Sequence, residues 1–187
     1  MAGELVLFLK QMLSNPRHVG AVIPSSSALA QSMVVNLGPQ TRRVIELGAG
    51  TGQITRAILS AGVPDENLVA VEMNPVFCTA LQTAHPGMRV VNGLAQDLTR
   101  LETGPVDAIL SSLPMLNISA DVQDQIISTA FDLLGPKGIF VQFTYGLKPP
   151  IAPDIRDKHR LGWTKRPVVW ANIPPAQVYV FSRAASH

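Results

Sequence analysis

The chain has 187 residues, enough for one domain with a substantial core and too few for two full domains. Hydrophobic residues make up 47% of it and charged residues only 15%, which excludes a disordered chain and a protein that coats nucleic acid with positive charge. A single cysteine, Cys78, excludes an internal disulfide and a cysteine-based zinc site, and we expect no bound metal.

The beginning of the chain predicts a short helix at residues 4–13, with an apolar stripe along one face. Close to the basic residues Lys10, Arg17 and His18, such a helix can lie at a membrane interface. The alternative is that it packs across the sheet as a lid, and periodicity alone favours the lid. No positively charged leader and no apolar run long enough to span a bilayer are visible, so we expect a cytoplasmic protein.

The remaining residues alternate between predicted helices and strands. Pro24, Ser25 and Ser26 form a capping signal for a helix at 28–35. Strands are expected at 44–45, 67–72, 88–91, 106–111, 139–145, 167–171 and 177–183. Further helices are expected at 53–59, 75–84 and 121–134, and an irregular region at 146–162. This alternation predicts a parallel sheet, and the last two strands predict a closing antiparallel pair.

Residues 44–52, Val-Ile-Glu-Leu-Gly-Ala-Gly-Thr-Gly, are the most informative stretch. Glycines after a buried strand allow a sharp turn and leave backbone against which a ligand can lie, and the following helix start offers free N–H groups. A dinucleotide site would also use such glycines, but its spacing is G-x-G-x-x-G, and Glu46 would repel a pyrophosphate. The segment resembles motif I of the class I S-adenosylmethionine-dependent methyltransferases, in which this acid meets the positively charged amino-acid end of the cofactor.

Glu72 ends the second predicted strand, about 20 residues past the first turn, where doubly wound folds place a ribose-binding carboxylate. In methyltransferases this acid chelates both ribose hydroxyls. The alternative is a favourable charge at the start of the next helix, since Asn74-Pro75 can begin one. The register with Glu46 favours the ligand role.

Taken together, the motifs resemble one family, the bacterial phospholipid N-methyltransferases, which methylate phosphatidylethanolamine towards phosphatidylcholine. The matching segments cover nearly the whole chain: 8–10, 15–17, 19–26, 45–52, 113–114, 143–146 and 170–176. The glycine motif is shared by many methyltransferases, whereas Val-Gly-Ala-Val-x-Pro-Ser-Ser and Trp-x-Asn-x-Pro-Pro-Ala are far more specific. The resemblance implies an α/β fold, with a Rossmann-like seven-stranded class I methyltransferase sheet preceded by an N-terminal amphipathic helix.

The resemblance also implies a binding site for S-adenosylmethionine, with S-adenosylhomocysteine as the product. The residues expected to contact the cofactor are Glu46, Gly48, Gly50, Thr51, Gly52, Glu72, Met73, Leu94, Ala95 and Ser111. One departure concerns the position after Gly93, which is often an aspartate that reads the adenine amino group and is Leu94 here. Adenine would then be held by backbone groups of Leu94 and Ala95, or by Asp97.

For the acceptor, an aromatic face suits an amine that becomes permanently cationic as it is methylated. Tyr145, at the end of the fifth strand, is the candidate for this contact, with Ser112 as a second catalytic candidate and Pro114 beside it. Tyr145 could alternatively be a strand-end tyrosine with its hydroxyl in water. Arg17 and His18 are expected to bind the lipid phosphate.

Two tryptophans and a basic cluster are interpreted as structural. Trp163 and Trp170 are expected in the core, with an anchoring role at a membrane interface as the alternative. The basic residues within 156–160 are expected to form a solvated helix face, with a lipid role as the alternative.

We expect a monomer divided into an N-terminal lid or membrane-contact region, 1–36, and a methyltransferase domain, 37–187. It would associate peripherally with an anionic membrane, at the inner face of the bacterial cytoplasmic membrane, and bind no nucleic acid.

The main alternative is an adenine N6-methyltransferase of ribosomal RNA, whose Asn-Leu-Pro-Tyr motif resembles residues 112–115. Here the asparagine and tyrosine positions are Ser112 and Met115, so the amide acceptor and stacking ring are missing. A methyltransferase of a small soluble amine and a non-catalytic membrane-shaping protein are further alternatives, and the intact cofactor motifs argue against the last.

Overall fold

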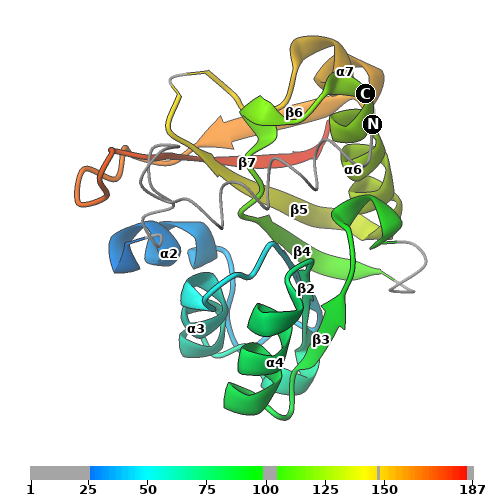
Figure 1. Cartoon of the computed structure of the whole chain (residues 1–187). Helices are drawn as coiled ribbons and strands as arrows, with labels where there is room; N and C mark the ends of the chain where they lie inside the picture. Colours follow the sequence, from blue (N-terminus) through cyan, green and yellow to red (C-terminus); the bar gives the residue numbers. More distant parts are fainter. Residues whose placement is uncertain (1–25, 99–104, 147, 185–187) are drawn as a thin grey trace.

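The computed structural model describes residues 26–98, 105–146 and 148–184, and within them the chain forms one seven-stranded sheet (Figure 1). The strand order is β3-β2-β1-β4-β5-β7-β6, and β7 runs antiparallel to both of its neighbours. The strands are β1 Val44–Leu47, β2 Leu68–Glu72, β3 Arg89–Asn92, β4 Val106–Ser111, β5 Leu134–Thr144, β6 Leu161–Lys165 and β7 Gln177–Arg183. The predicted seven-stranded, Rossmann-like sheet is therefore confirmed.

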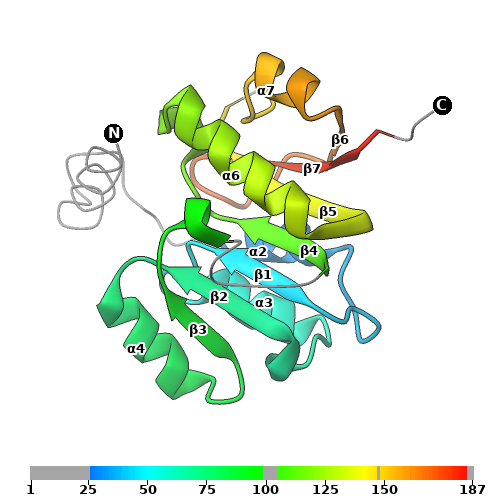
Figure 2. The ribbon, with the colours of Figure 1, turned by 90° about the vertical axis from the view of Figure 1, so that its right-hand side faces the viewer.

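Helices cover both faces of this sheet, and Figure 2 looks onto the face covered by α6. The helices α2 Ser27–Val34, α3 Gln53–Ser60 and α4 Pro75–Ala84 share one core with the strands, and α6 Ala120–Leu133 and α7 Pro153–Lys158 share the other. Short 3-10 turns lie at Asp65–Asn67 (η1), Ala95–Asp97 (η2) and Met115–Asn117 (η3). Because both faces are covered, every residue of β1 and β2 is buried.

The helix starts follow the capping chemistry of the sequence. The Ser26 side chain accepts a hydrogen bond from the Leu29 amide at 3.1 Å, and α2 begins one residue later. Asn74 accepts from the Val76 amide at 2.9 Å and is followed by Pro75 at the first helical position of α4. The predicted helices at 28–35 and 75–84 are thus confirmed within one residue.

The chain changes direction next to β1. It runs outward from β1 to β2 and β3, then returns to place β4 on the other side of β1. The loops that leave β1 and β4 therefore diverge at the carboxyl ends of the strands. In doubly wound sheets this is the point where ligands bind.

The C-terminal third differs from the sequence-based expectation. The strand expected at 167–171 is wrong, because this stretch contributes only an isolated bridge between Val169 and Ala176. The sixth strand is instead β6, which begins at the end of the region expected to be irregular, and α7 lies inside that region. β5 begins at Leu134, earlier than expected, directly after α6.

The helix expected at 4–13 lies outside the described residues. Within the described ranges, no helix is long and apolar enough to cross a bilayer.

Candidate active site

The glycine loop follows β1 at the switch point. Gly48, Gly50 and Gly52 have φ angles of 72°, 52° and 76°, which favour glycine. A Cβ at Gly48 would lie 3.2 Å from Leu113 Cδ2, and one at Gly52 would lie 2.8 Å from Leu81 Cδ2. A Cβ at Gly50 would meet nothing closer than 4.0 Å. The outer glycines therefore permit close packing, and the middle one leaves bare backbone beside open space.

Glu46 is fully buried in β1, between β2 and β4. Its Oε2 accepts a hydrogen bond from Thr55 Oγ1 at 2.6 Å, and its Oε1 has no partner among the described residues. Burial raises the pKa of this carboxyl to about 7, against the opposing effect of the Thr55 hydrogen bond. A buried carboxylate oxygen without a partner suits a cationic ligand group, as the sequence-based interpretation of Glu46 requires.

Glu72 ends β2 and connects it to the glycine loop. Its Oε2 accepts from the Gly50 amide at 2.9 Å, and its Oε1 accepts from the Asn74 amide at 2.8 Å. The Asn92 side chain donates to the carbonyl oxygens of Glu72 and Met73, each at 3.0 Å. Asn92 fixes the backbone that carries Glu72, and no recognisable motif pointed to it.

Leu94 and Ala95 lie in the turn after β3, adjacent to Glu72. The Gly93 amide donates to the Glu72 carbonyl at 3.1 Å, which joins this turn to the end of β2. The Leu94 carbonyl accepts from the Asp97 amide at 3.0 Å. Leu94 and Ala95 are both half-buried. The structure thus brings the expected adenine-contact residues beside the expected ribose-contact residue.

The end of β4 lies across the glycine loop. The Ser112 amide donates to the Leu47 carbonyl at 2.9 Å, and a Cβ at Gly48 would lie 3.9 Å from Ser112 Cβ. Ser111 is buried, and its hydroxyl accepts from the Leu113 amide at 3.3 Å. Pro114, half-buried, precedes η3. The end of β4 therefore lies beside the loop at Ser112, and Pro114 follows two residues later.

Tyr145 follows β5, the strand next to β4. Its side chain is 46% exposed, and its ring meets the Phe143 ring edge-on at 5.5 Å between centroids. Partial burial raises the pKa of its hydroxyl, and a hydrogen bond with the Asn172 side chain acts in the opposite direction. The tyrosine therefore presents part of its ring at the carboxyl edge of the sheet while its hydroxyl is held.

Asn172 is the main residue to which sequence analysis gave no role. It is 1% exposed, its Oδ1 accepts from the Ser26 amide at 2.9 Å, and its Nδ2 donates to the Pro174 carbonyl at 2.7 Å. It thereby joins the start of α2 to the turn before β7. The Trp-x-Asn-x-Pro-Pro-Ala motif was the available signal.

For three of the expected site residues the predicted contact stays a prediction. Arg17 and His18 lie outside the described residues. Thr51 is exposed, and its carbonyl accepts from Arg56 Nη1 at 3.0 Å. Its position on the glycine loop leaves its expected cofactor contact a prediction.

The basic cluster at 156–160 makes structural contacts. Lys158 Nζ and His159 Nε2 lie 2.6 and 2.8 Å from the two oxygens of Asp124, which joins α7 to α6. The Arg156 guanidinium lies 5.9 Å from the centre of the Trp163 ring. These contacts support the helix-surface interpretation. The core interpretation of the two tryptophans is wrong, because Trp163 is 42% and Trp170 77% exposed.

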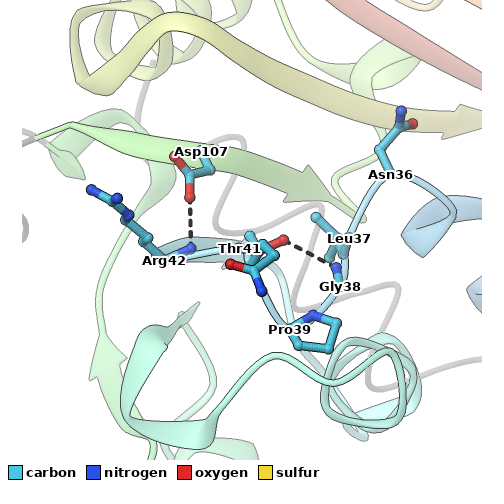
Figure 3. Close-up of a pocket in the computed structure, with 8 residues that line it drawn as sticks. Asn36, Leu37, Gly38, Pro39, Thr41, Arg42 and Asp107 are labelled. Atoms are coloured by element: carbon cyan, nitrogen blue, oxygen red, sulfur yellow. Dashed lines mark hydrogen bonds between the residues drawn. The ribbon is translucent and has the colours of Figure 1, made fainter.

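A pocket on the opposite edge of the sheet is not part of this site (Figure 3). It is lined by residues 36–42 and Asp107, at the amino ends of β1 and β4. The Asp107 carboxylate accepts from the Arg42 amide at 2.6 Å, and Thr41 Oγ1 accepts from the Gly38 amide at 3.0 Å. These bonds shape the loop that enters β1. Within the described ranges, no three His, Cys, Asp or Glu side chains are grouped so that they could hold a metal ion.

Comparison with known proteins identifies the family. A family model described as a methyltransferase domain matches residues 44–138, the segment that holds the glycine loop, Glu72 and the end of β4. The chain belongs to the class I S-adenosylmethionine-dependent methyltransferases. Members of this family use S-adenosylmethionine as methyl donor, so the predicted cofactor and its product, S-adenosylhomocysteine, are confirmed.

Relatives of this methyltransferase differ in substrate. It is 30% identical over 149 residues to the ornithine lipid N-methyltransferase of Singulisphaera acidiphila, a match that covers 75% of this chain and 78% of that protein. It is 42% identical over 93 residues to the ribosomal RNA small subunit methyltransferase A of Sinorhizobium fredii, but this match covers 46% of the chain and only 30% of that protein. The crystal structure of an O-methyltransferase from Bacillus cereus with S-adenosylhomocysteine has a TM-score of 0.61 at 15% identity, covering 96% of this chain and 90% of that one, which shows the shared fold.

Proposed function

We propose that this methyltransferase methylates the amine headgroup of phosphatidylethanolamine and its methylated intermediates, towards phosphatidylcholine. The observation that carries the proposal is the similarity to a lipid N-methyltransferase over most of both chains. The segments Phe143–Gly146 and Trp170–Ala176, which resemble the phospholipid N-methyltransferases, supply Tyr145 and Asn172 at the same edge of the sheet.

The residues around the switch point fit the cofactor. S-adenosylmethionine, when bound, supplies an electrophilic methyl group on a sulfonium. The open backbone at Gly50 would accept it closely, the free Oε1 of Glu46 would pair with its ammonium, and Glu72 would accept from its ribose hydroxyls. Because Glu72 also holds the Gly50 amide, the same carboxylate fixes the loop and the ribose.

On the acceptor side, the enzyme has to align a neutral amine with the methyl group, and proximity and orientation supply most of the rate. The Tyr145 ring face attracts the growing methylammonium charge through cation–π interaction, with Ser112 and Pro114 as the opposite wall. Because the pKa of the Tyr145 hydroxyl is raised, this group stays protonated at neutral pH and does not act as a base. The proton released by the amine then passes to solvent.

The proposal extends to the cellular setting. The enzyme works as a peripheral protein at the inner face of the bacterial cytoplasmic membrane, with Arg17 and His18 binding the lipid phosphate. It acts as a monomer with an N-terminal region, 1–36, serving as lid or membrane contact for the domain at 37–187.

The ribosomal RNA alternative is weakened at the residue that would stack on the base. Met115 occupies that position and is 2% exposed, packed in the core below α6. Ser112 replaces the amide that would hold the adenine amine. The RNA methyltransferase match also leaves most of that relative's length unmatched.

A substrate panel tests the proposal. Purified protein with methyl-labelled S-adenosylmethionine is given, in separate reactions, phosphatidylethanolamine vesicles, ornithine lipid vesicles, free ethanolamine and ribosomal RNA. We expect label in extracted phosphatidylethanolamine derivatives. Label confined to ornithine lipid would retain a lipid amine acceptor and overturn the phosphatidylethanolamine assignment, and label confined to RNA or free ethanolamine would overturn the lipid class.

A further inference from the structure

The turn between β6 and β7 presents large apolar side chains to solvent. Trp170 is 77%, Ile173 74% and Val168 37% exposed, and Trp170 is the most exposed of the large apolar side chains that the structure describes. Exposed apolar residues scattered singly are ordinary, but several within one short segment mark an interaction surface. We call residues 167–175 the apolar turn.

The apolar turn is anchored at its base. Val169 pairs with Ala176 through an amide-to-carbonyl bond of 2.8 Å, and the buried Asn172 binds the Ser26 amide and the Pro174 carbonyl. Trp170 and Ile173, which flank this buried asparagine in the sequence, are both largely exposed. Because the backbone is already fixed, docking these two side chains costs little ordering entropy.

The apolar turn borders the candidate acceptor site. Gln177, two residues after it, pairs with Thr144, the last residue of β5, so the turn lies at the edge where Tyr145 emerges. In Figure 1 it is the orange loop beside α2. Leu116, 60% exposed in η3, adds an apolar side chain beside the residue that follows Tyr145: a Cβ at Gly146 would lie 3.3 Å from Leu116 Cδ1.

Charge around the apolar turn favours an anionic lipid surface as its partner. Residues 161–187 contain no Asp or Glu, and Lys165 and Arg166 immediately precede the turn at its end of β6. Lys165, two residues before the turn, and Lys148, after β5, are both exposed. An exposed tryptophan with aliphatic neighbours and nearby lysines suits the bilayer interface, where the indole lies among headgroups and lysines meet lipid phosphates.

We propose that the apolar turn, with Leu116, docks the enzyme on an anionic bilayer so that the acceptor site beside Tyr145 faces the lipid headgroups. This inference rests on the proposed lipid substrate, and it assigns the docking contact to the folded domain. The lipid amine then reaches the site without leaving the membrane.

The test removes the two most exposed side chains in the full-length protein. The double variant Trp170→Ser/Ile173→Ser is compared with Val35→Ser, which alters an aliphatic residue that is 61% exposed at the end of α2. Binding to vesicles containing phosphatidylglycerol is measured by flotation, and methylation is measured with phosphatidylethanolamine in those vesicles and with a short-chain analogue dissolved as monomers.

We expect the double variant to lose vesicle binding and vesicle methylation by at least about tenfold, since two apolar side chains no longer enter the interface. Methylation of the dissolved analogue should stay within about twofold of the parental rate, less than the effect of half a kcal/mol, and the control variant should match the parent.

A direct readout follows Trp170 itself. In Trp163→Phe, Trp170 is the remaining tryptophan, and anionic vesicles should shift its emission to shorter wavelength as the indole leaves water. An unchanged emission would overturn the docking inference.

The outcomes separate this inference from the proposed function. If the double variant floats like the parent while the parent methylates lipid, the docking inference fails and the proposed function stands. If the parent floats through this turn but labels no lipid, docking stands and the proposed acceptor is wrong. If the double variant lost methylation of the dissolved analogue as strongly as methylation of vesicles, these side chains would belong to the pocket. If the parental protein were a dimer and the double variant a monomer, the turn would be a contact between copies. Either result overturns the inference.

Discussion

At the scale of single residues, the buried carboxyl of Glu46 gives the protein a pH dependence of defined sign. Its pKa is about 7 in the folded protein, whereas the ordinary value is 4.5. Between these values the folded protein holds the proton and the unfolded chain does not, so stability falls as pH rises through this window. The total effect is on the order of 3 kcal/mol.

Glu46→Gln imitates the protonated carboxyl and should remove most of this pH dependence. In the cofactor-free protein we expect its Tm to exceed the parental Tm above the folded pKa and to approach it at the acid end of the window. Affinity for S-adenosylmethionine should fall, because the ammonium loses its anionic partner. Thermal unfolding across the pH range and calorimetric titration measure the two effects, with the exposed Glu66→Gln as the matched control. A parental Tm that does not decline through the window would contradict the assignment.

Glu72 carries two amide contacts as well as its expected ribose contact. Glu72→Ala should weaken cofactor binding by at least about tenfold, since each hydrogen bond to a charged group contributes about 1.5–3 kcal/mol. Glu72→Gln keeps one acceptor oxygen and should lose less. Calorimetry measures both affinities, and Glu66→Ala serves as control. Unchanged affinity in Glu72→Ala would remove Glu72 from the cofactor site.

Tyr145 allows the ring and the hydroxyl to be separated. We expect Tyr145→Ala to lose most activity while its cofactor affinity stays within a few fold, because the residue is assigned to the acceptor. In Tyr145→Phe, a strong loss indicates that the hydroxyl orients the amine, and a mild loss indicates that the ring dominates. Initial rates on phosphatidylethanolamine vesicles decide between these. A parental rate in Tyr145→Ala would place the acceptor elsewhere along the strand ends.

Candidate site residues that lie in a sequence motif could be predicted, whereas the residues that hold them in place by hydrogen bonds could not. Glu46 lies in β1, Glu72 ends β2 and Gly48 follows β1, and this spacing is recognisable in the sequence, so a cofactor site could be predicted here. Thr55 and Asn92 donate hydrogen bonds to the Glu46 carboxylate and the Glu72 carbonyl, which lie 9 and 20 residues away in the chain. Such contacts depend on packing, and no spacing of residue types announces them.

At the scale of elements, the buried strands were predicted from sequence more closely than the exposed elements. β1, β2 and β4 are covered on both faces and read as apolar runs, and they were predicted close to their bounds. β6 is an edge strand with mostly exposed side chains, and its sequence shows no such run. α7 has only six residues, a single buried side chain and no side-chain cap, so it was missed. The apolar residues at 168–170 suggested a strand, but two of the three side chains face solvent.

The N-terminal segment carries its own prediction. If residues 4–13 contact the membrane, full-length protein should float with anionic vesicles better than a protein starting at Ser14, because Lys10 and the apolar stripe would add binding. Flotation of both proteins, with circular dichroism to show that the shorter one is folded, measures this. Equal flotation would favour the lid interpretation. The comparison is independent of the apolar turn, which both proteins retain.

At the scale of the whole molecule, the switch point, the Tyr145 end of β5 and the apolar turn share the carboxyl edge of one sheet. The cofactor, the lipid amine and the bilayer would thus be met on one side of the protein. The opposite edge holds the pocket at residues 36–42 and Asp107, whose hydrogen bonds organise the entry to β1. With the proposed function, this arrangement would let a single domain methylate a lipid that stays in its membrane.

The central claim, methylation of phosphatidylethanolamine, is tested most directly by the lipids of a cell that makes the protein. The chain is expressed in a bacterium whose membrane contains phosphatidylethanolamine and no phosphatidylcholine, beside the Glu72→Ala variant, and extracted lipids are analysed by mass spectrometry. The account predicts phosphatidylethanolamine species heavier by one or more methylene units with the parental chain and their near absence with the variant. A lipid profile identical to that of the variant, from parental protein that is folded and binds S-adenosylmethionine, would contradict it.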